Sequence, residues 1–340
     1  MNGFQSKMTI IQQSKRKTYS FDKSPLYKLS SKRKLANLLG IQLNELNAFL
    51  KQPPDYNYRI YRDKETRRFI TEPISVRLKI HKSILKLISR ISPPAYIHSA
   101  FKNRSYKTNA EYHLSGSNLF TIDIKKFFPS IQFETLHSYF FNKLKCSIDI
   151  ATILAKLCTV RTKLYGVHLP TGSCISPILS FFVNQRLFND IEQLCLNEGC
   201  AFSVYVDDIT VSGENATSQL LNKIALKIHN AGYRYHKIKT FKATPATITG
   251  LIVFKGKLDI PHIRKKRIRV LMEALVNTSS PHIKQQILAS LIGRLSEVEQ
   301  VLPQYKNIRL KLLLEYSKDW QVIKDKRVLA QKCKFEKVAK

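Results

Sequence analysis

Two adjacent aspartates lie between two short apolar runs beyond the middle of the chain. The run Ala201–Val204 precedes the segment Tyr205–Asp208, which reads Tyr-Val-Asp-Asp, and Ile209–Ser212 follows it. Apolar and β-branched runs of this length predict two strands of one hairpin, with both carboxylates at its tip. Adjacent carboxylates repel each other, which is tolerable where a divalent cation neutralises them. A solvated turn is the alternative, so the rest of the chain has to decide.

A third carboxylate, Asp123, lies inside the apolar run Leu119–Ile124, which predicts a buried strand. A carboxylate in such a place is costly unless it is paired or binds a metal. A salt bridge to Lys or Arg is therefore the other interpretation. Two more stretches matter: a Gly/Ser/Pro loop at Leu169–Pro177, which leads into a helix, and a turn with a basic strand at Gly232–Thr240.

In this order and spacing, the stretches resemble the palm of reverse transcriptases. Asp123 stands where that family has its first catalytic aspartate, and Tyr205–Asp208 matches its Tyr-x-Asp-Asp box. Leu169–Pro177 resembles the Leu-Pro-x-Gly loop, with Thr171 where many relatives carry Gln, and Gly232–Thr240 resembles the Gly…Lys-Thr element. The resemblance implies an α+β right-hand polymerase fold with fingers, a palm whose antiparallel sheet is backed by helices, and a helical thumb.

Two further segments narrow the resemblance. Asn109 and His113 form an Asn-Ala-x-x-His pattern before the first aspartate, and Ile248–Gly250 reads Ile-Thr-Gly. These resemble the Asn-Ala-x-x-His and Val-Thr-Gly signatures of bacterial retron reverse transcriptases, the second with Ile for Val. On this basis we expect Asn109 and His113 to bind RNA and to position its branch region. A surface helix that begins with Thr108 as its N-cap is the alternative.

The chemistry that this resemblance implies is phosphoryl transfer with two metal ions. Asp123 and Asp207 would bridge two Mg²⁺ ions, and Asp208 would assist one of them. Mg²⁺ is expected because the ligands are hard oxygens, and Mn²⁺ is the expected substitute.

The incoming dNTP is expected to meet three further residues. Arg68, with Arg67 as its rival, lies on the second strand of a predicted fingers hairpin and would grip the triphosphate with two nitrogens at once. Phe128 stands where relatives exclude a ribose 2′-hydroxyl, although Phe127 and Phe128 would also suit a hydrophobic core. Gly172 would let the backbone approach the nucleotide, because it has no Cβ.

The patterns divide the chain into three regions. Residues 1–22 are predicted to be a loose basic arm, residues 23–260 the fingers and palm, and residues 261–340 a helical basic thumb with a C-terminal tail. Thr247–Phe254 is predicted as one strand that pairs with Lys257–Ile260. The thumb would hold a nucleic-acid duplex by its phosphates, and a solvated helical bundle is the alternative. The basic residues that begin it are Arg264, Lys265, Lys266, Arg267 and Arg269.

The charge balance favours a polyanionic partner. The chain has 57 Lys and Arg against 24 Asp and Glu, a formal net charge of +33, which is typical of nucleic-acid binding. No run approaches the ~18–20 apolar residues that span a bilayer, so no membrane partner is expected. Six cysteines without a Cys-x-x-Cys pair predict a reduced, cytoplasmic protein.

The retron resemblance also implies partners and a product. Such enzymes bind a cognate structured non-coding RNA, start from a guanosine 2′-hydroxyl within it and use dNTPs to make branched RNA–DNA, called multicopy single-stranded DNA, in anti-phage defence. A separate effector protein, either a toxin or a nuclease, is expected. Host ribonuclease H is expected to remove the template, because no second acidic cluster follows Ser212. The alternatives are a catalytically idle RNA–DNA scaffold for an effector and a group II intron-type reverse transcriptase or maturase.

Overall fold

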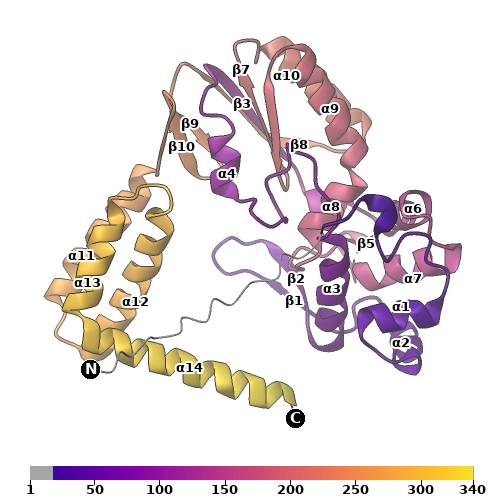
Figure 1. Ribbon diagram of the computed structural model, residues 1–340, viewed down its shortest axis with the longest axis horizontal. Helices are drawn as coiled ribbons and strands as arrows, with labels where there is room; N and C mark the ends of the chain where they lie inside the picture. The colour runs from indigo at the N-terminus through magenta and orange to yellow at the C-terminus, as the bar shows by residue number, and fades with distance from the viewer. Residues whose placement is uncertain (1–17, 340) are drawn as a thin grey trace, which may run out of the picture. The chain divides into compact units, whose positions relative to one another are not determined.

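The computed structural model describes residues 18–339, with side chains described as far as residue 329. The chain divides into two compact units, and Figure 1 labels most of their elements. Of the described residues, unit 1 comprises 18–102, Ile124–Asp190 and His229–Arg234. Unit 2 comprises Asn103–Asp123, Ile191–Ile228 and 235–339.

Unit 1 is mainly helical and carries two antiparallel hairpins, β1–β2 and β4–β5. The first is the hairpin predicted from the sequence, with Tyr58 opposite Pro73. Its second strand begins one residue after Arg68, which therefore lies in the connecting turn. The elements are a 3₁₀ helix (Phe21–Lys23), α1 (Lys32–Leu39), α2 (Leu43–Leu50), β1 (Tyr58–Arg62), β2 (Phe69–Pro73), α3 (Ser75–Ile88), α5 (Phe127–Ser130), α6 (Phe133–Ser138), a π-helix (Tyr139–Lys143), α7 (Ile148–Cys158), β4 (Val160–Thr162), β5 (Gly166–His168) and α8 (Ser176–Val183).

The described end of the predicted N-terminal arm is packed onto unit 1. Tyr19 forms a parallel bridge with Ile91. The ring of Phe21 meets the rings of Tyr139 and Phe182 edge-on, with centroids 6.3 Å apart in both pairs. Residues 18–22 are therefore not a loose arm, because aromatic contacts fix them to the unit. Residues 1–17 of the predicted arm lie outside the described residues.

Unit 2 is built on a four-stranded sheet in the order β6-β7-β3-β8. The central strand β7 runs antiparallel to both β6 and β3. Helix α10 (Ser218–Asn230) lies along this sheet in Figure 1 and buries an apolar stripe that includes Leu220, Ile224 and Ile228. The predicted α+β class is thereby confirmed. The other elements are α4 (Tyr106–Glu111), β3 (Asn118–Ile124), β6 (Ala201–Tyr205), β7 (Asp208–Gly213) and β8 (Tyr235–Lys242), and the second part of α9 (Gln185–Asn197), which begins in unit 1.

A second sheet, in the order β11-β10-β9, leads into the C-terminal helices. The single strand predicted over Thr247–Phe254 is wrong, because Thr249 and Gly250 have φ angles of 44° and 82° and turn the chain back on itself. Two strands result, β9 (Ala246–Ile248) and β10 (Leu251–Phe254), followed by β11 (Lys257–Asp259).

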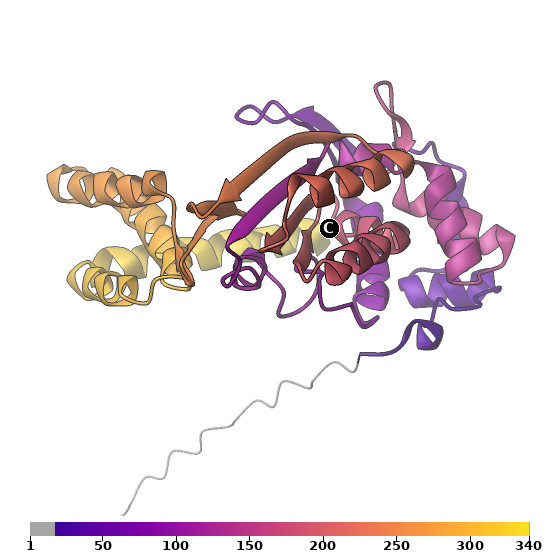
Figure 2. The ribbon, with the colours of Figure 1, turned by 90° about the horizontal axis from the view of Figure 1, so that it is seen from above.

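Four helices follow this sheet, shown in orange and yellow in Figure 2. The region predicted as a C-terminal tail is helical as far as Ala339. Among residues 18–339, no helix is both long enough and apolar enough to cross a bilayer. The helices are α11 (His262–Asn277), α12 (Pro281–Val298), α13 (Tyr305–Glu315) and α14 (Ser317–Ala339).

One apolar core joins the second sheet to these helices. Ile248 of β9, Leu251 of β10, and Leu288 and Leu291 of α12 are all fully buried in it. Leu119 of β3 belongs to the same core. Burial of apolar surface therefore also attaches the four-stranded sheet to the second sheet and the C-terminal helices. The turn at Thr249 is thus held in a fixed place within unit 2.

Candidate active site

The hairpin predicted around the paired aspartates is present as β6 and β7. Its register runs from Ala201 opposite Ser212 to Tyr205 opposite Asp208, which leaves a two-residue turn. The first turn residue, Val206, has a φ of 60°. Tight hairpin turns of this length require a positive φ there, and glycine is the residue that adopts it without strain. A β-branched residue in that conformation is strained, so backbone strain is stored beside the aspartates.

Replacing Val206 by glycine is expected to raise the free energy of unfolding by roughly 0.5–2 kcal/mol. Relief of the strained backbone at Val206 should stabilise the fold by about 1–3 kcal/mol. Glycine also gives the unfolded chain more conformational entropy, which cancels about 0.5–1 kcal/mol of that gain. Urea denaturation of the full chain measures the difference. The matched control is Val204→Gly, which removes the same side chain from the fully buried part of β6 and should destabilise. A Val206→Gly protein less stable than the parent would contradict the strain.

Strand β3 brings the third predicted ligand beside the hairpin. Asp123 stands opposite Asp208 in antiparallel register. Directly opposed residues project from the same face of a sheet, with Cβ atoms about 4.5–5.5 Å apart. Both aspartates line a cavity of about 510 Å³, together with Tyr205. Two like charges at this separation repel, so the cavity favours cations and hydrogen-bond donors.

The structure therefore brings two of the three predicted metal ligands together. Asp207 is the second residue of the turn. Among the side chains described, those of residues 18–329, no group of three His, Cys, Asp or Glu could hold a metal ion. Mg²⁺ is commonly held by one or two carboxylates together with substrate phosphates and water. The oxygen donors of Asp123 and Asp208 fit a divalent cation that is shared with a phosphate ligand.

The remaining cavity wall is basic and rich in hydroxyl groups. Lys237 and Lys239 of β8 are exposed, and Arg264 of α11 reaches the cavity while paired with Glu297 at 3.0 Å. Burial raises the pKa of the Tyr205 phenol, and the nearby Asp208 charge raises it further, so this hydroxyl stays protonated near neutral pH. Cations and donors around paired carboxylates suit a ligand that carries phosphates.

Several cavity residues were not singled out from the sequence. Thr121 and Thr210 lie two residues from Asp123 and Asp208, on the same strands and therefore on the same face. Strand alternation alone could have identified both. Tyr106 carries no such signal, because α4 reaches the cavity only through tertiary packing.

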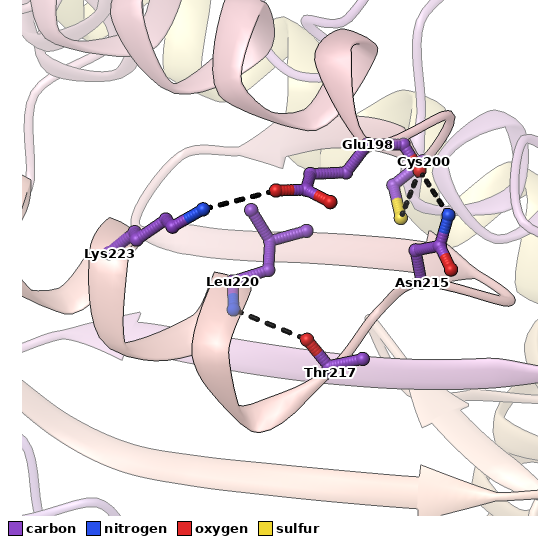
Figure 3. Close-up of polar contacts among 6 residues, drawn as sticks. All are labelled: Glu198, Cys200, Asn215, Thr217, Leu220 and Lys223. Atoms are coloured by element: carbon purple, nitrogen blue, oxygen red, sulfur yellow. Dashed lines mark hydrogen bonds and ion pairs between the residues drawn. The ribbon is translucent and has the colours of Figure 1, made fainter.

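The end of the hairpin far from the turn is fastened by polar contacts, drawn in Figure 3. The backbone carbonyl of Glu198 accepts a hydrogen bond from Asn215 Nδ2 at 2.9 Å, and the Glu198 carboxylate pairs with Lys223 at 3.1 Å. Thr217 Oγ1 accepts from the backbone N–H of Leu220 at 3.4 Å, which caps the start of α10. These contacts connect the segment before β6 with the segment after β7.

Asn109 and His113 are buried, with no exposed surface on either residue. The expected direct contact between these side chains and RNA is therefore wrong for this structure. The alternative, a surface helix capped by Thr108, is also wrong. The N-cap of α4 is Ser105, whose Oγ accepts from the backbone N–H of Thr108 at 3.2 Å.

The basic cluster at the start of α11 separates into two groups. Arg264 and Lys265 are half-buried and pair with Glu297 and Asp259, at 3.0 and 2.6 Å. The other three side chains are exposed, as phosphate contact requires, and their binding of nucleic acid stays a prediction. They are Lys266, Arg267 and Arg269.

The three predicted nucleotide-binding residues all lie in unit 1. Arg68 and its rival Arg67 are exposed in the turn before β2. Phe127 is 3% exposed and belongs to the core, whereas Phe128 is only half-buried and keeps surface for a ligand. Nucleotide binding by Arg68, Phe128 and Gly172 stays a prediction.

The Leu-Pro-x-Gly loop packs tightly against β2. A Cβ on Gly172 would lie 2.9 Å from Ile70 Cγ2 and 3.1 Å from the Thr71 carbonyl oxygen. Thr171 Oγ1 accepts from the Thr71 N–H at 3.1 Å and donates to the Phe69 carbonyl at 2.8 Å. The Cβ direction of Gly172 thus faces β2, and the glycine is required for the close approach of that strand.

The chain is similar to known proteins over most of its length. Residues 54–271 match the family model described as Reverse transcriptase (RNA-dependent DNA polymerase). Over 338 residues it is 26% identical to the Retron Se72 reverse transcriptase of Salmonella heidelberg (strain 579083-10), covering 87% of this chain and 86% of that protein. It is also 26% identical over 230 residues to the Retron Ec86 reverse transcriptase of Escherichia coli, covering 63% and 69%. A solved structure of a foamy viral protease-reverse transcriptase in complex with double-stranded DNA aligns with a TM-score of 0.45 and 17% identity, over 76% of this chain and 38% of that one.

Proposed function

The chain belongs to the reverse transcriptase family and is an RNA-directed DNA polymerase, and we propose that it acts in a retron. It would copy part of a cognate structured non-coding RNA, starting from a guanosine 2′-hydroxyl, to give branched RNA–DNA. The observation that carries this proposal is the similarity to the Retron Se72 enzyme over 87% of this chain and 86% of that protein. The similarity to the Retron Ec86 reverse transcriptase supports the same assignment.

We infer that the paired carboxylates of the cavity form the polymerase centre. Asp123 and Asp208, with Asp207 in the adjoining turn, would hold Mg²⁺, or Mn²⁺ in its place. Such ions, when bound, supply Lewis acidity to the primer hydroxyl and to the triphosphate. The strands keep Asp123 and Asp208 opposite each other before substrate arrives, so little reorganisation is needed at the moment of reaction. Lys237 and Lys239 offer positive charge to phosphates on the same wall.

Nucleotide and duplex binding are assigned to residues outside this centre. Arg68 would take the triphosphate, Phe128 would exclude a ribose 2′-hydroxyl, and Gly172 would place the loop backbone near the nucleotide. The exposed basic side chains of α11 would contact the phosphates of the template–product duplex, which gives affinity without sequence reading. Under this proposal α11–α14 form the thumb, and residues 23–260 form the fingers and palm.

The proposed partners follow from the retron assignment. They are the cognate RNA, the DNA made from it, dNTPs, host ribonuclease H and a separate effector protein, either a toxin or a nuclease. The biological setting would be anti-phage defence in the cytoplasm. The large positive charge of the chain, +33, supports a nucleic-acid partner.

Co-expression of the chain with its neighbouring non-coding RNA tests the proposal. Nucleic acid is extracted, treated with ribonuclease and with debranching enzyme, and separated on a denaturing gel. We expect a discrete single-stranded DNA that shifts on debranching and is absent from an Asp207→Asn/Asp208→Asn variant.

Each other outcome would overturn a defined part of the proposal. DNA that does not shift on debranching would keep the polymerase and remove the 2′-primed retron assignment. Absence of DNA with RNA binding retained would favour an idle scaffold that holds an effector.

A further inference from the structure

Four buried polar side chains form a connected group against the base of the aspartate hairpin. His113 Nδ1 lies 2.7 Å from Ser212 Oγ of β7, and His113 Nε2 lies 2.7 Å from Ser203 Oγ of β6. Ser203 Oγ donates to Asn109 Oδ1 at 2.8 Å. The exposed fraction of each residue is 0–2%. We call these residues, Asn109, His113, Ser203 and Ser212, the buried relay.

The hydrogen bonds of the buried relay run in one direction, each residue donating to the next from Ser212 through His113 and Ser203 to Asn109. Ser203 has a single hydroxyl hydrogen, which it gives to Asn109, so its oxygen accepts from His113 Nε2–H. In a neutral imidazole Nδ1 then accepts from the Ser212 hydroxyl. Buried hydrogen bonds of this kind are expensive to leave unmade, so the relay holds both strands to the segment that carries His113.

Strand alternation places the relay on the same face as the catalytic carboxylates. Ser212 lies four residues after Asp208 on β7, and Ser203 lies two residues before Tyr205 on β6. Residues separated by an even number share a face, and four residues span about 13 Å along a strand. None of the four relay residues lines the cavity that holds Asp123 and Asp208, so the relay links β6 to β7 behind the tip.

Two further contacts hold the same segment in place. Thr249 Oγ1 donates to the Tyr106 backbone carbonyl at 2.9 Å, which ties the start of α4 to the turn between β9 and β10. At the other end, a Cβ on Gly116 would lie 2.5 Å from Ser212 Cβ, so a glycine is required for the chain to pass this closely. Residues 106–116 are thus attached at both ends and in the middle.

We propose that Asn109 and His113 are positioning residues that set the catalytic hairpin through Ser203 and Ser212. This inference rests on the proposed catalytic role of the hairpin. It gives the Asn-Ala-x-x-His pattern a function inside the protein: the pattern fixes β6 against β7. Tyr205 then stays opposite Asp208, and Asp208 keeps the place from which it faces Asp123. Without the relay, the strand ends can shift relative to each other, and the carboxylates lose their shared orientation.

The test is single-turnover extension of a DNA primer on an RNA template by the full chain. His113→Ala is expected to lower the extension rate constant about 10–100-fold, the usual effect of removing a residue that orients a site. The dNTP concentration that gives half of the maximal rate should change less than the rate constant, because Arg68, Phe128 and Gly172 lie in unit 1. His113→Gln should recover part of the rate, since its amide can accept from Ser212 and donate to Ser203.

A stability-matched control separates positioning from simple destabilisation. Leu154→Ala removes a fully buried side chain of α7 in unit 1 and should leave the rate per folded molecule unchanged. If His113→Ala is recovered only unfolded, the inference is tested with Ser212→Ala instead. This variant removes one hydroxyl group of the relay and changes the side-chain volume little. A normal rate in folded His113→Ala or in Ser212→Ala would overturn the inference.

Asp123→Asn, measured in the same assay, distinguishes failure of the inference from failure of the proposed function. If Asp123→Asn extends normally, the hairpin is not the catalytic centre, and both proposals fail. If Asp123→Asn is inactive while His113→Ala is normal, only the positioning role fails.

Discussion

Asp123→Asn should lower the rate of nucleotide addition by about 10³-fold or more while leaving the fold at least as stable. The loss follows from removing one of two opposed charges, since preorganised electrostatic groups of this kind each contribute on the order of 10²–10³-fold and ligands that act as a unit contribute more. The stability should rise by about 0.2–1 kcal/mol, because like charges directly opposite on neighbouring strands are destabilising.

Activity and stability moving in opposite directions identify a functional carboxylate. Primer extension and urea denaturation are measured on the same preparation of each variant. Asp208→Asn is included and should also lose activity without losing stability. The control is Asp149→Asn in unit 1, an aspartate in the first turn of α7 that bonds to Ser147 and lies outside the proposed centre. It should retain the parent rate. An Asp123→Asn protein that loses activity and stability together would indicate a structural salt bridge instead.

Gly172→Ala should lower the free energy of unfolding by about 1–3 kcal/mol, the range found when atoms are inserted into tightly packed sites. The added Cβ would meet Ile70 Cγ2 at 2.9 Å and the Thr71 carbonyl oxygen at 3.1 Å, and the second of these atoms belongs to the backbone of β2. The loop or the strand must therefore shift. Because this loop is the proposed nucleotide-binding loop, kcat/KM for the dNTP should fall on the order of 10–100-fold.

Gly293→Ala is the matched substitution for this experiment. Gly293 lies within α12, and apart from the neighbouring backbone of that helix no heavy atom lies within 4 Å of the position that a Cβ would take. Alanine there should stabilise by about 0.5–1 kcal/mol, because it is a better helix former than glycine. Unfolding curves and dNTP titrations of both variants give the comparison. If Gly172→Ala were as stable as the parent, β2 could move away from the added Cβ at no cost, and the expected steric clash would be contradicted.

The local elements around the aspartates could be predicted because short-range patterns decide them. The runs on either side of Tyr205–Asp208 form β6 and β7 within one residue of the expected bounds, and Asp123 lies on the expected strand. The hairpin before α3 was likewise predicted. In contrast, the strand expected over Thr247–Phe254 is interrupted, because Thr249 adopts a positive φ. A β-branched residue such as threonine rarely adopts this conformation, so the sequence did not predict it.

The environment of Asn109 and His113 could not be predicted in the same way. Their pattern is polar and reads like the start of an exposed helix. The partners of His113 are serines 90 and 99 residues further along the chain, and each serine sits in a strand where it looks unremarkable. Burial of this kind depends on which surfaces meet, and a single sequence does not contain that information.

The sequence by itself determined the residue types at the centre, the strands that carry them and the basic character of the chain, because these depend on alternation, turn chemistry and composition. Only the tertiary structure decided that Asp123 faces Asp208, that Asn109 and His113 are buried against the hairpin, and that Gly172 is required by β2. Each of these contacts joins segments about 90–100 residues apart or strands from separate parts of the chain. Their geometry is set by the packing of whole elements, which local preferences do not specify.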